Sequence, residues 1–534
     1  MSRLSISWRN KEDFRLRLSI KAAIVLLVFL LIIISYASWG FVGIFAVIAQ
    51  WFASTALITR VSGLLLVLGI LLLIVYGIVS KHEVTSLGLL KSIGGVLIAL
   101  SVVGLIVGGL LYLEKTPYHI RVERLEEPIN VFGIYRFVPM KTAYTNAISM
   151  LQIPTHTLYF RDSYVYFANG SLTYNWIIEP EGFWNEVSKG PRGVVFVNAG
   201  IYPPQVEIIY RNMTWGLHNI RLMPGYVDGL YREAQLLAGF DKKLLLEDNV
   251  EVVWNKQIYI LIPAVTWITG LDYSLPTLAG YVVIDENGSM EWLNVDEAKH
   301  DPRFQGVPLL PEVVAREWVE AYKWIYGIGN VLIYRNTFQI RDVGTNPQPY
   351  LVLDDKGRLW WVFVAEPPGE TYSAKYIFYI STDEVEPHVY VYELPEPMIG
   401  VSKVEAYVKQ RYPTYDWGQL SIEEPIPTII NNTLYWKVSV TTSDGRGLVT
   451  VCLVNAKTGT ADCIQPRGRV SYLDIMDMIL NKTTTKPNVT GNLTLIEQVR
   501  ELKDKVKSLI NELESIYREL EAIEEQLNKT SGGK

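Results

Sequence analysis

The side chains that could carry out acid–base or metal chemistry are spread along the chain rather than grouped. No two of the six histidines lie within four residues of each other, and no His-Glu-x-x-His, paired-cysteine, Gly-x-Ser-x-Gly or glycine-rich phosphate motif occurs. We therefore expect no metal site, no cofactor and no catalytic residue, which predicts that the protein is not an enzyme.

Three carboxylate pairs are the remaining candidates for such chemistry, since paired carboxylates can bind calcium or transfer protons. They fall at predicted turns and strand ends, where we expect them to be solvated surface groups. The pairs are Asp354 with Asp355, Glu384 with Glu386, and Glu423 with Glu424.

The two cysteines of the chain have a spacing that favours a covalent link. Cys452 and Cys463 lie on short predicted strands on either side of the turn at 455–459. A hairpin at this turn places the two residues opposite each other, and an exterior, oxidising setting favours a cross-strand disulfide. The alternative is two buried thiols that act as small hydrophobic side chains.

Eight Asn-x-Ser/Thr sequons form the next chemical signal, and all of them follow residue 160. Chance alone predicts roughly three, and glycosylation of asparagine requires exposure outside the cell. We therefore expect a glycoprotein whose larger part faces the exterior. The candidate asparagines are Asn169, Asn212, Asn287, Asn431, Asn481, Asn488, Asn492 and Asn528.

The elements that position the cysteines are predicted between residues 398 and 470. An amphipathic helix at 401–412 ends before Pro413, and the Asp444–Gly445 pair supplies the chemistry of a tight hairpin turn. Strands are expected at 420–423, 434–441, 448–454 and 461–464.

This order of elements, with Tyr435-Trp-Lys-Val-Ser-Val440 before Asp444 and the 455–459 turn after it, resembles a PepSY module. Asn455 stands where that family often has Asp. The resemblance implies a small extracytoplasmic helix-and-sheet domain, often attached to membrane proteins and proposed to bind peptides or modulate proteases. It implies no catalytic residue.

Similar units are predicted upstream, which gives an α+β fold built from related modules in series. The turns at 283–288, 352–357 and 453–459 look alike, and Trp360 and Trp361 must point to opposite faces of one strand. One of these tryptophans therefore packs against a neighbouring module or offers a binding patch.

Segment 301–397 is predicted as helix 311–326 followed by strands 331–341, 349–353, 359–364, 376–381 and 389–392. Segment 115–300 is predicted as helices 142–151 and 228–238 with strands 157–167, 193–197, 250–262 and 280–284.

The first 114 residues read as a membrane anchor, because residues 22–59 carry no charged side chain and about 20 apolar residues span a bilayer. Transmembrane helices are predicted at 22–37, 61–79 and 87–113, with an aromatic segment lying at the interface after the first. Gly95, Ala99, Gly104 and Gly108 give the third helix a small-residue face, which favours close packing within the chain over dimerisation.

Charge sets the expected orientation of this anchor. Six Lys or Arg residues precede the first span, and Lys81 and Lys91 flank the loop between the second and third. The positive-inside rule then predicts a multi-pass protein of the cell membrane, with residues 1–21 in the cytoplasm and residues after about 115 outside. A four-span alternative, with 22–59 folded as a hairpin, would place the large part inside.

A segment whose sequence favours oligomerisation follows the predicted modules. After a polar linker at 471–494 that carries three of the sequons, apolar residues recur in alternating steps of four and three. This predicts a coiled coil at 495–528 that joins copies of the chain, as a dimer or as three or four helices, although a single amphipathic helix docked on its own chain is the alternative. The predicted core residues are Leu495, Val499, Leu502, Val506, Leu509, Leu513, Ile516, Leu520, Ile523 and Leu527.

Composition narrows the function without naming a partner. The net charge of -6 gives no basic footprint for nucleic acid. Scarce Cys and His with dense sequons are typical of an archaeal-type surface glycoprotein. We expect a non-enzymatic, membrane-anchored homo-oligomer that binds envelope or surface-layer proteins and contacts the lipid bilayer. The alternative is an accessory or regulatory subunit of a membrane protease or export complex that uses PepSY-like peptide-binding modules.

Overall fold

The computed structural model describes Leu30 and residues 42–79, 88–161, 163–168, 170–182, 184–185, 189–213, 230–246, 248–335, 337–369 and 372–475 of the chain. These residues fall almost wholly in a compact unit that ends at Tyr472, and a second unit begins at Leu473. The predicted coiled coil and most of the linker before it lie outside the described residues.

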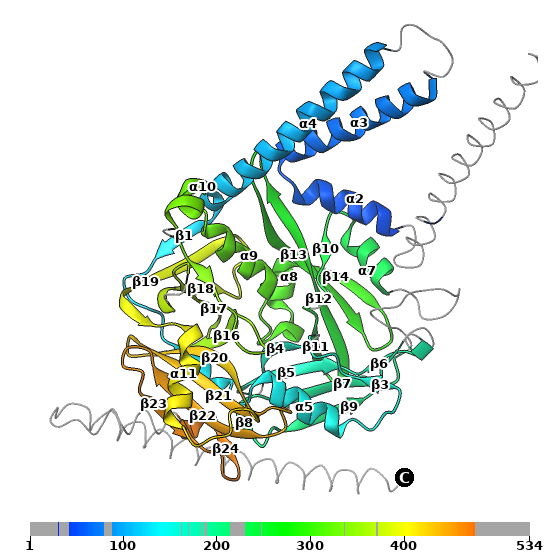
Figure 1. Cartoon of the computed structure of the whole chain (residues 1–534). Helices are drawn as coiled ribbons and strands as arrows, with labels where there is room; N and C mark the ends of the chain where they lie inside the picture. The colour runs from blue at the N-terminus through cyan, green and yellow to red at the C-terminus, as the bar shows by residue number, and fades with distance from the viewer. Residues whose placement is uncertain are drawn as a thin grey trace, which may run out of the picture. The chain divides into compact units, whose positions relative to one another are not determined.

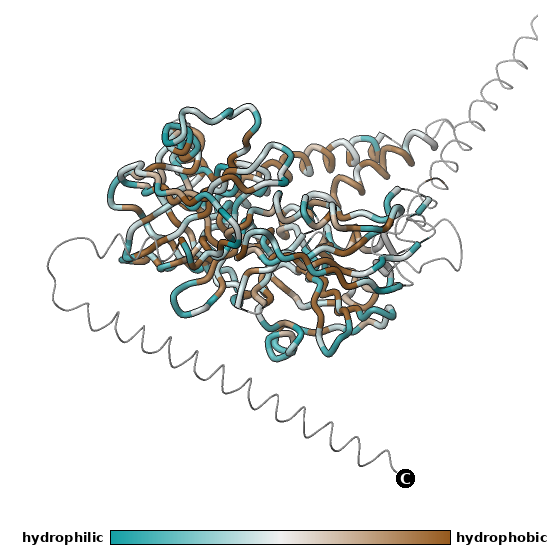
Figure 2. Tube along the Cα trace, turned by 90° about the horizontal axis from the view of Figure 1, so that it is seen from below, coloured by the Kyte–Doolittle hydropathy of each residue, from teal (hydrophilic) through white to brown (hydrophobic). Residues whose placement is uncertain are grey.

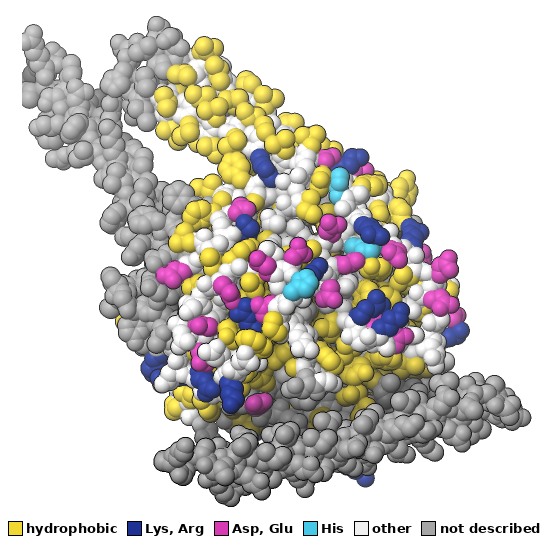
Figure 3. Space-filling model, turned by 180° about the vertical axis from the view of Figure 1, so that it is seen from behind, with side chains coloured by type: hydrophobic (Ala, Val, Ile, Leu, Met, Phe, Trp, Pro, Cys, Tyr) yellow, Lys and Arg dark blue, Asp and Glu magenta, His cyan; other side chains and the backbone are white. Residues whose placement is uncertain are grey.

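Among the described helices before residue 120, α3 and α4 are long and apolar enough to cross a membrane (Figure 1). Helix α3 (Leu57–Val79) matches the predicted span at 61–79, and α4 (Gly88–Lys115) matches the one at 87–113. Of the predicted span at 22–37 only Leu30 is described. Figure 3 shows a nearly continuous hydrophobic surface over α3 and α4, in contrast to the charged surface next to them.

Helices α3 and α4 pack through small residues, as the spacing predicted. Ser101 donates a hydrogen bond of 2.7 Å to the carbonyl of Ser62, which requires the two backbones to approach closely. A Cβ atom at Gly108 would lie 3.0 Å from the hydroxyl of Thr59, and one at Gly104 would collide with Ser62. Gly95 has no such neighbour, so the small-residue face that is used contains Gly104 and Gly108.

The preceding helix, α2 (Val42–Ser54), packs on the large folded part of the chain, residues 116–472, which we call the body. Its 13 residues are too few to span a hydrocarbon core. Gln50 donates a hydrogen bond of 2.9 Å to the carbonyl of Lys242, and the first residue of α3, Leu57, donates to Gly270. Helix α3 therefore leaves from the body and α4 returns to it.

An eleven-stranded mixed sheet forms the largest layer of the body. Its strands are β1 (Arg121–Arg124), β2 (Val131–Phe132), β15 (Gln339–Ile340), β16 (Tyr350–Asp354), β17 (Leu359–Glu366), β18 (Ser373–Ser381), β19 (His388–Ile399), β20 (Leu420–Ile430), β21 (Thr433–Thr442), β22 (Leu448–Asn455) and β23 (Ala461–Ile464). The order is β1-β19-β18-β17-β16-β2-β20-β21-β22-β23, with β15 paired to β17, and β1 runs parallel to β19.

The predicted boundary between 301–397 and 398–470 does not interrupt this sheet. The two-residue strand β2 comes from far upstream and joins β16 to β20. The prediction of a strand at 331–341 is wrong, because Asn330–Tyr334 forms a π-helical turn and only β15 is extended. An apolar run this short shows no clear hydrophobic periodicity, so its sequence does not distinguish a strand from a helix.

Both faces of the sheet are covered. On one face, helix α11 (Val401–Arg411) buries Val401, Val404 and Val408 against strand residues that include Trp360 and Trp436. On the other face, Trp361 donates its indole N–H to the carbonyl of Leu310, and it is buried as fully as Trp360. The pair of tryptophans is therefore packing on both sides, and neither forms an exposed patch.

Smaller sheets and helices complete the body (Figures 1 and 2), with hydrophobic residues gathered inside and hydrophilic residues in the outer loops. One sheet contains β4 (Tyr164–Ala168), β5 (Ser171–Ile177), β7 (Gly193–Asn198) and β9 (Val206–Tyr210), and another contains β10 (Lys243–Leu244), β11 (Val250–Trp254), β12 (Gln257–Thr269), β13 (Ser274–Asp285) and β14 (Met290–Asn294). The short pairs are β3 (His156–Thr157) with β6 (Glu179–Pro180) and β8 (Ile201–Tyr202) with β24 (Val470–Ser471). The remaining α-helices described are α5 (Met140–Met150), α7 (Leu230–Ala238), α8 (Val295–His300), α9 (Glu312–Tyr322) and α10 (Gly327–Gly329).

The three turns that look alike in sequence also share their hydrogen bonding. In each, an Asp or Asn side chain accepts from two backbone N–H groups that follow it, and a glycine with positive φ closes the turn. The acceptors are Asp285, Asp354 and Asn455, and the glycines are Gly288, Gly357 and Gly459. Such turns are a general device of tight hairpins, so the duplication of modules stays a prediction.

The predicted disulfide is present. Cys452 of β22 pairs in register with Cys463 of β23, and their sulfur atoms are bonded.

Replacing both Cys452 and Cys463 by alanine is expected to lower the free energy of unfolding by about 2–3 kcal/mol, because the link closes a short loop in the unfolded chain. Urea titration of the oxidised protein and the double variant measures this difference. Equal midpoints would show that the bond adds no stability.

Three of the predicted glycosylation sites lie on exposed positions of the described chain. Asn212 follows β9, Asn287 is in the β13–β14 turn, and Asn431 is in the β20–β21 turn. Asn169, Asn481, Asn488, Asn492 and Asn528 lie outside the described residues. The exposure of the three sites meets the steric requirement for a glycan, and their glycosylation stays a prediction.

Candidate functional site

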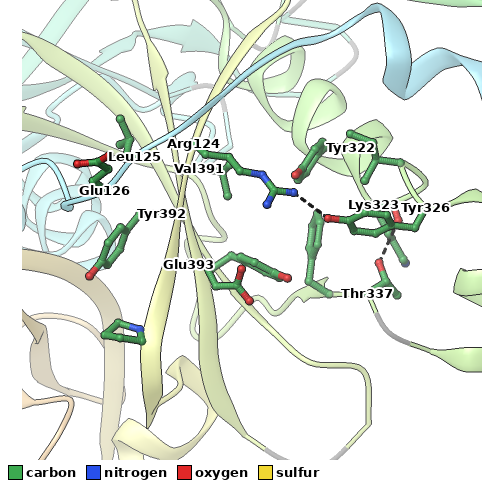
Figure 4. A pocket seen from close by; sticks show the side chains of 14 residues that line it. Arg124, Leu125, Glu126, Tyr322, Lys323, Tyr326, Thr337, Val391, Tyr392 and Glu393 are labelled. Atoms are coloured by element: carbon green, nitrogen blue, oxygen red, sulfur yellow. Dashed lines mark hydrogen bonds between the residues drawn. The ribbon is translucent and has the colours of Figure 1, made fainter.

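A pocket of about 220 Å³ opens beside the edge strand β1, at the end of helix α9 (Figure 4). Aromatic rings from three parts of the chain line it together with charged side chains. The rings are Tyr322, Tyr326, Phe338, Tyr376 and Tyr392, and the charged residues are Arg124, Glu126, Lys323 and Glu393.

The local sequence explains how the rings come together. Helix α9 is amphipathic and buries Trp318 and Tyr322 against the sheet. After it, Gly327 has φ of 83°, a conformation that favours glycine, and the chain turns back. Thr337 then donates a hydrogen bond of 3.0 Å to the carbonyl of Lys323, which joins the two ends of this segment. Phe338 thereby lies beside Tyr322.

Arg124 supplies the positive charge of the pocket. Figure 4 shows its guanidinium reaching from β1 toward Tyr326, to whose hydroxyl it donates a hydrogen bond of 2.9 Å. This hydrogen bond raises the pKa of Arg124, and burial raises the pKa of Tyr322, so both groups keep their usual charge at neutral pH. The pocket therefore offers apolar ring faces, phenolic hydroxyls and the guanidinium of Arg124, with the side chain of Lys323 as a second cation.

The volume and setting of the pocket restrict what it can hold. Small-molecule sites are typically about 300–1,000 Å³, so this pocket suits one or two side chains better than a cofactor. Among the described residues, no strand pairs with the outer edge of β1, whose backbone groups are thus available to an added strand. An extended peptide could pair with that edge and place a side chain among the rings.

A second unusual site is a layer of charged groups buried between the large sheet and the β4–β9 sheet. Glu423 and Glu424 were predicted to be solvated surface groups, and this prediction is wrong: both are 1% exposed. Glu424 has φ of 48°, beside a bulge in β20, and this conformation turns both carboxylates inward. Glu423 pairs with Lys141 at 3.0 Å.

Glu424 is the acceptor at the centre of this layer. One of its oxygens accepts from Arg136 at 3.1 Å, from the backbone N–H of Met140 at 3.0 Å, and from Asn346 at 2.9 Å. Burial is the largest single effect on Arg136 and lowers its pKa, but Glu424, Tyr174 and Tyr350 together outweigh burial, so the pKa of the guanidinium is raised. Arg136 also lies 5.5 Å from the ring centre of Tyr174.

Lys437 lies in the same layer and is fully buried. Within the described residues, its ammonium nitrogen has no hydrogen-bond partner. Burial lowers the pKa of Lys437 to about 7, opposed by the charge of Glu424 and reinforced by that of Arg136. Glu312, at the start of α9, retains some contact with solvent, yet desolvation of its carboxyl and the charge of Asp248 raise its pKa to about 8.

In the other two carboxylate pairs, the prediction of solvated surface groups holds for Asp355 and Glu386 but is wrong for Asp354, which is 3% exposed. Asp354 is buried in its turn and bonds Arg358 and Trp360, whereas Asp355 is exposed. Glu384 bonds the ring of His388 at 2.9 Å, and Glu386 is exposed. No cluster of three or more His, Cys, Asp or Glu side chains in the described part of the chain is placed to hold a metal ion.

Sequence reasoning missed the aromatic pocket and the buried charges. The pocket combines residues between positions 124 and 395, and its tyrosines belong to no sequence motif. For the buried layer, the alternation of polar Lys437 and Ser439 with apolar Val438 and Val440 indicated a strand but gave no sign of a second layer over its polar face.

No family model, curated protein or solved structure matches this chain. Its function is therefore inferred from its own residues.

Proposed function

We propose that this chain is a non-enzymatic, membrane-anchored surface protein whose body binds an extended segment of a partner polypeptide at the aromatic pocket beside β1. The observation that carries the proposal is the combination of five aromatic rings with an unpaired strand edge in the described chain. Rigid aromatic rings give large contact area at low entropic cost, and backbone pairing gives affinity for any extended segment.

The anchor supports the membrane location. Because α2 packs on the body, and α3 leaves and α4 returns there, the body and α2 lie on one side of the membrane if both helices span it. The predicted span at 22–37 then carries the chain from the cytoplasm to that side. The proposed orientation is a basic N-terminal tail inside and the body, with its exposed sequons, outside.

The predicted coiled coil at 495–528 supplies the proposed oligomerisation, and envelope or surface-layer proteins are the proposed partners. A second candidate is an accessory subunit of a membrane protease or export complex. This candidate is favoured by one observation: the pocket adjoins the end of α4, because Glu114 of α4 accepts a hydrogen bond from Ile328, two residues after pocket residue Tyr326. A polypeptide leaving the membrane would meet the pocket there.

Photo-crosslinking at Glu393 tests this proposal. A photoreactive residue at Glu393, which lines the pocket, is expected to capture a polypeptide in native membranes, whereas the same residue at Glu396 on the same strand is not. Tyr326→Ala removes an exposed ring and should reduce capture from Glu393 about tenfold without changing the unfolding temperature.

The identity of the captured protein separates the two candidates. An abundant envelope protein recovered in comparable amounts supports the surface-protein function, and a scarce protease or translocase subunit supports the accessory function. Equal capture from Glu393 and Glu396, or capture that Tyr326→Ala leaves unchanged, would refute the pocket as the binding site.

A further inference from the structure

The segment from Tyr326 to Tyr334 exposes an unusually apolar surface. It contains α10 and the π-helical turn, and it presents Leu332, Ile333 and Tyr334 with 65%, 74% and 78% of their surface in solvent. For comparison, the most exposed large hydrophobic side chain of α3 and α4 is Leu89, at 69%. These side chains are therefore as open as those on the lipid-facing surface of a candidate span.

The fold itself makes no use of these side chains. No residue of the π-helical turn is buried. Burial of large apolar side chains stabilises a fold, so three adjacent side chains left in water forgo a substantial contribution. Adjacent exposed apolar residues of this kind mark a surface that another phase or molecule covers.

The position of the segment indicates what covers it. The carboxylate of Glu114, in the last turn of α4, accepts a hydrogen bond of 3.0 Å from the backbone N–H of Ile328. A Cβ atom at Gly327 would lie 3.2 Å from the same carboxylate, so glycine permits this close approach. The apolar turn is thereby fixed to the end of the candidate span, where the interface of a bilayer begins.

A second, separate loop repeats this arrangement at the start of α3. The carbonyl of Leu271, in the β12–β13 loop, accepts a hydrogen bond of 3.1 Å from the N–H of Ile58, while the Leu271 side chain is 60% exposed. Tyr118, directly after α4, is also 60% exposed. Both candidate spans thus meet the body beside open apolar or aromatic side chains, and tyrosine is enriched at bilayer interfaces.

We propose that the 326–334 segment, with Leu271, inserts into the interfacial layer of the bilayer and holds the body against the membrane surface. This inference rests on the proposed membrane anchoring by α3 and α4. It places the aromatic pocket, whose wall includes Tyr326, at the level of the lipid headgroups. Insertion by a few side chains at about 5–10 Å depth is the usual behaviour of interfacial apolar segments.

Depth-dependent fluorescence quenching on the full chain tests the proposal. Single cysteines at Val67, Ile333 and Met150 are labelled with an environment-sensitive dye, and the protein is reconstituted into phosphatidylcholine vesicles that contain brominated acyl chains. Val67 lies in α3, and Met150 is an exposed residue at the end of α5. The native cysteines remain joined to each other and do not react.

We expect labels at Val67 and Ile333 to be quenched about threefold more strongly than a label at Met150, with blue-shifted emission at both sites. Quenching at Val67 without quenching at Ile333 would refute interfacial docking while the anchoring stands. A label at Ile333 that is shielded from aqueous iodide but not quenched by bromolipid would also refute it, since a second copy or another protein then covers the segment.

Absence of quenching at both Val67 and Ile333 would refute the anchoring and the docking together, which distinguishes it from the outcomes above. Because Ile333 has no buried contact, the labelled variant should unfold at the wild-type temperature. The charged substitution Ile333→Asp, with the label moved to Leu271, should weaken quenching at Leu271, because both loops dock on the same surface. Unchanged quenching at Leu271 would contradict joint insertion.

Discussion

Replacing Glu424 by leucine is expected to lower the free energy of unfolding by about 3–5 kcal/mol, the usual cost of removing one partner from a buried ion pair. Arg136 is only 3% exposed and would keep its charge without a counterion. The backbone N–H of Met140 and the amide of Asn346 would also lose their acceptor. Urea titration of the full chain in detergent, followed by tryptophan fluorescence, measures the loss.

A matched control for this variant is Glu405→Leu, the same substitution at an exposed i,i+4 pair with Lys409 on α11. Surface pairs contribute about 0–1 kcal/mol, so this change should be nearly neutral. The double variant Arg136→Met/Glu424→Leu also removes the charge of Arg136 and should be more stable than Glu424→Leu alone. Strictly additive losses would show that the two side chains do not stabilise each other.

Replacing Lys437 by methionine is expected to stabilise the protein at pH 6 by up to about 5 kcal/mol, since each unit of pKa shift corresponds to about 1.4 kcal/mol. The folded-state pKa of Lys437 is lowered to about 7, whereas an unfolded lysine titrates near 10.4. Between these values the unfolded chain binds more protons, so wild-type stability rises with pH across this window. The advantage of the variant should therefore shrink from pH 7 upward and nearly vanish above pH 10.

The measurement is the free energy of unfolding of wild type and variant between pH 6 and pH 10. Glu312 contributes the opposite slope below pH 8, because its folded pKa is raised to about 8, but it is present in both proteins and cancels in the difference. Lys457→Met, at a side chain 61% exposed, is the control and should show no such pH dependence. A pH-independent difference for Lys437→Met would contradict a neutral buried lysine.

The sequence predicted those elements whose hydrophobic periodicity distinguishes a helix from a strand. The helix at 401–412, the later strands of that module and the 455–459 turn lie where expected, because Asp-Gly and Asn-x-x-x-Gly turns fix hairpin register locally. The strand predicted at 420–423 is longer than expected and continues to Ile430. The cysteine pairing followed from the hairpin register. The two described candidate spans were equally clear, since apolar runs of this length are typical of membrane-spanning helices.

What could not be predicted depends on contacts between distant segments. Strand β2 contributes only two residues to the large sheet, which is too few to show a hydrophobic periodicity. Its place between β16 and β20 depends on contacts with strands far away in the sequence. Glu423 and Glu424 precede a proline and look like turn residues, but the β20 bulge turns them inward. The aromatic pocket likewise forms only after β1, α9 and β19 meet.

Helix α4 passes into β1 with only η3 (Thr116–His119) and Ile120 between them, and no flexible linker separates the two. The parallel ladder from Arg121↔His388 to Arg124↔Val391 then ties that strand to the sheet along its own axis. A force that tilts or pulls α4 loads these hydrogen bonds in shear, and they share it rather than open one at a time. Helix and sheet are therefore joined without a hinge, so a tilt of α4 would be transmitted directly to the edge of the sheet.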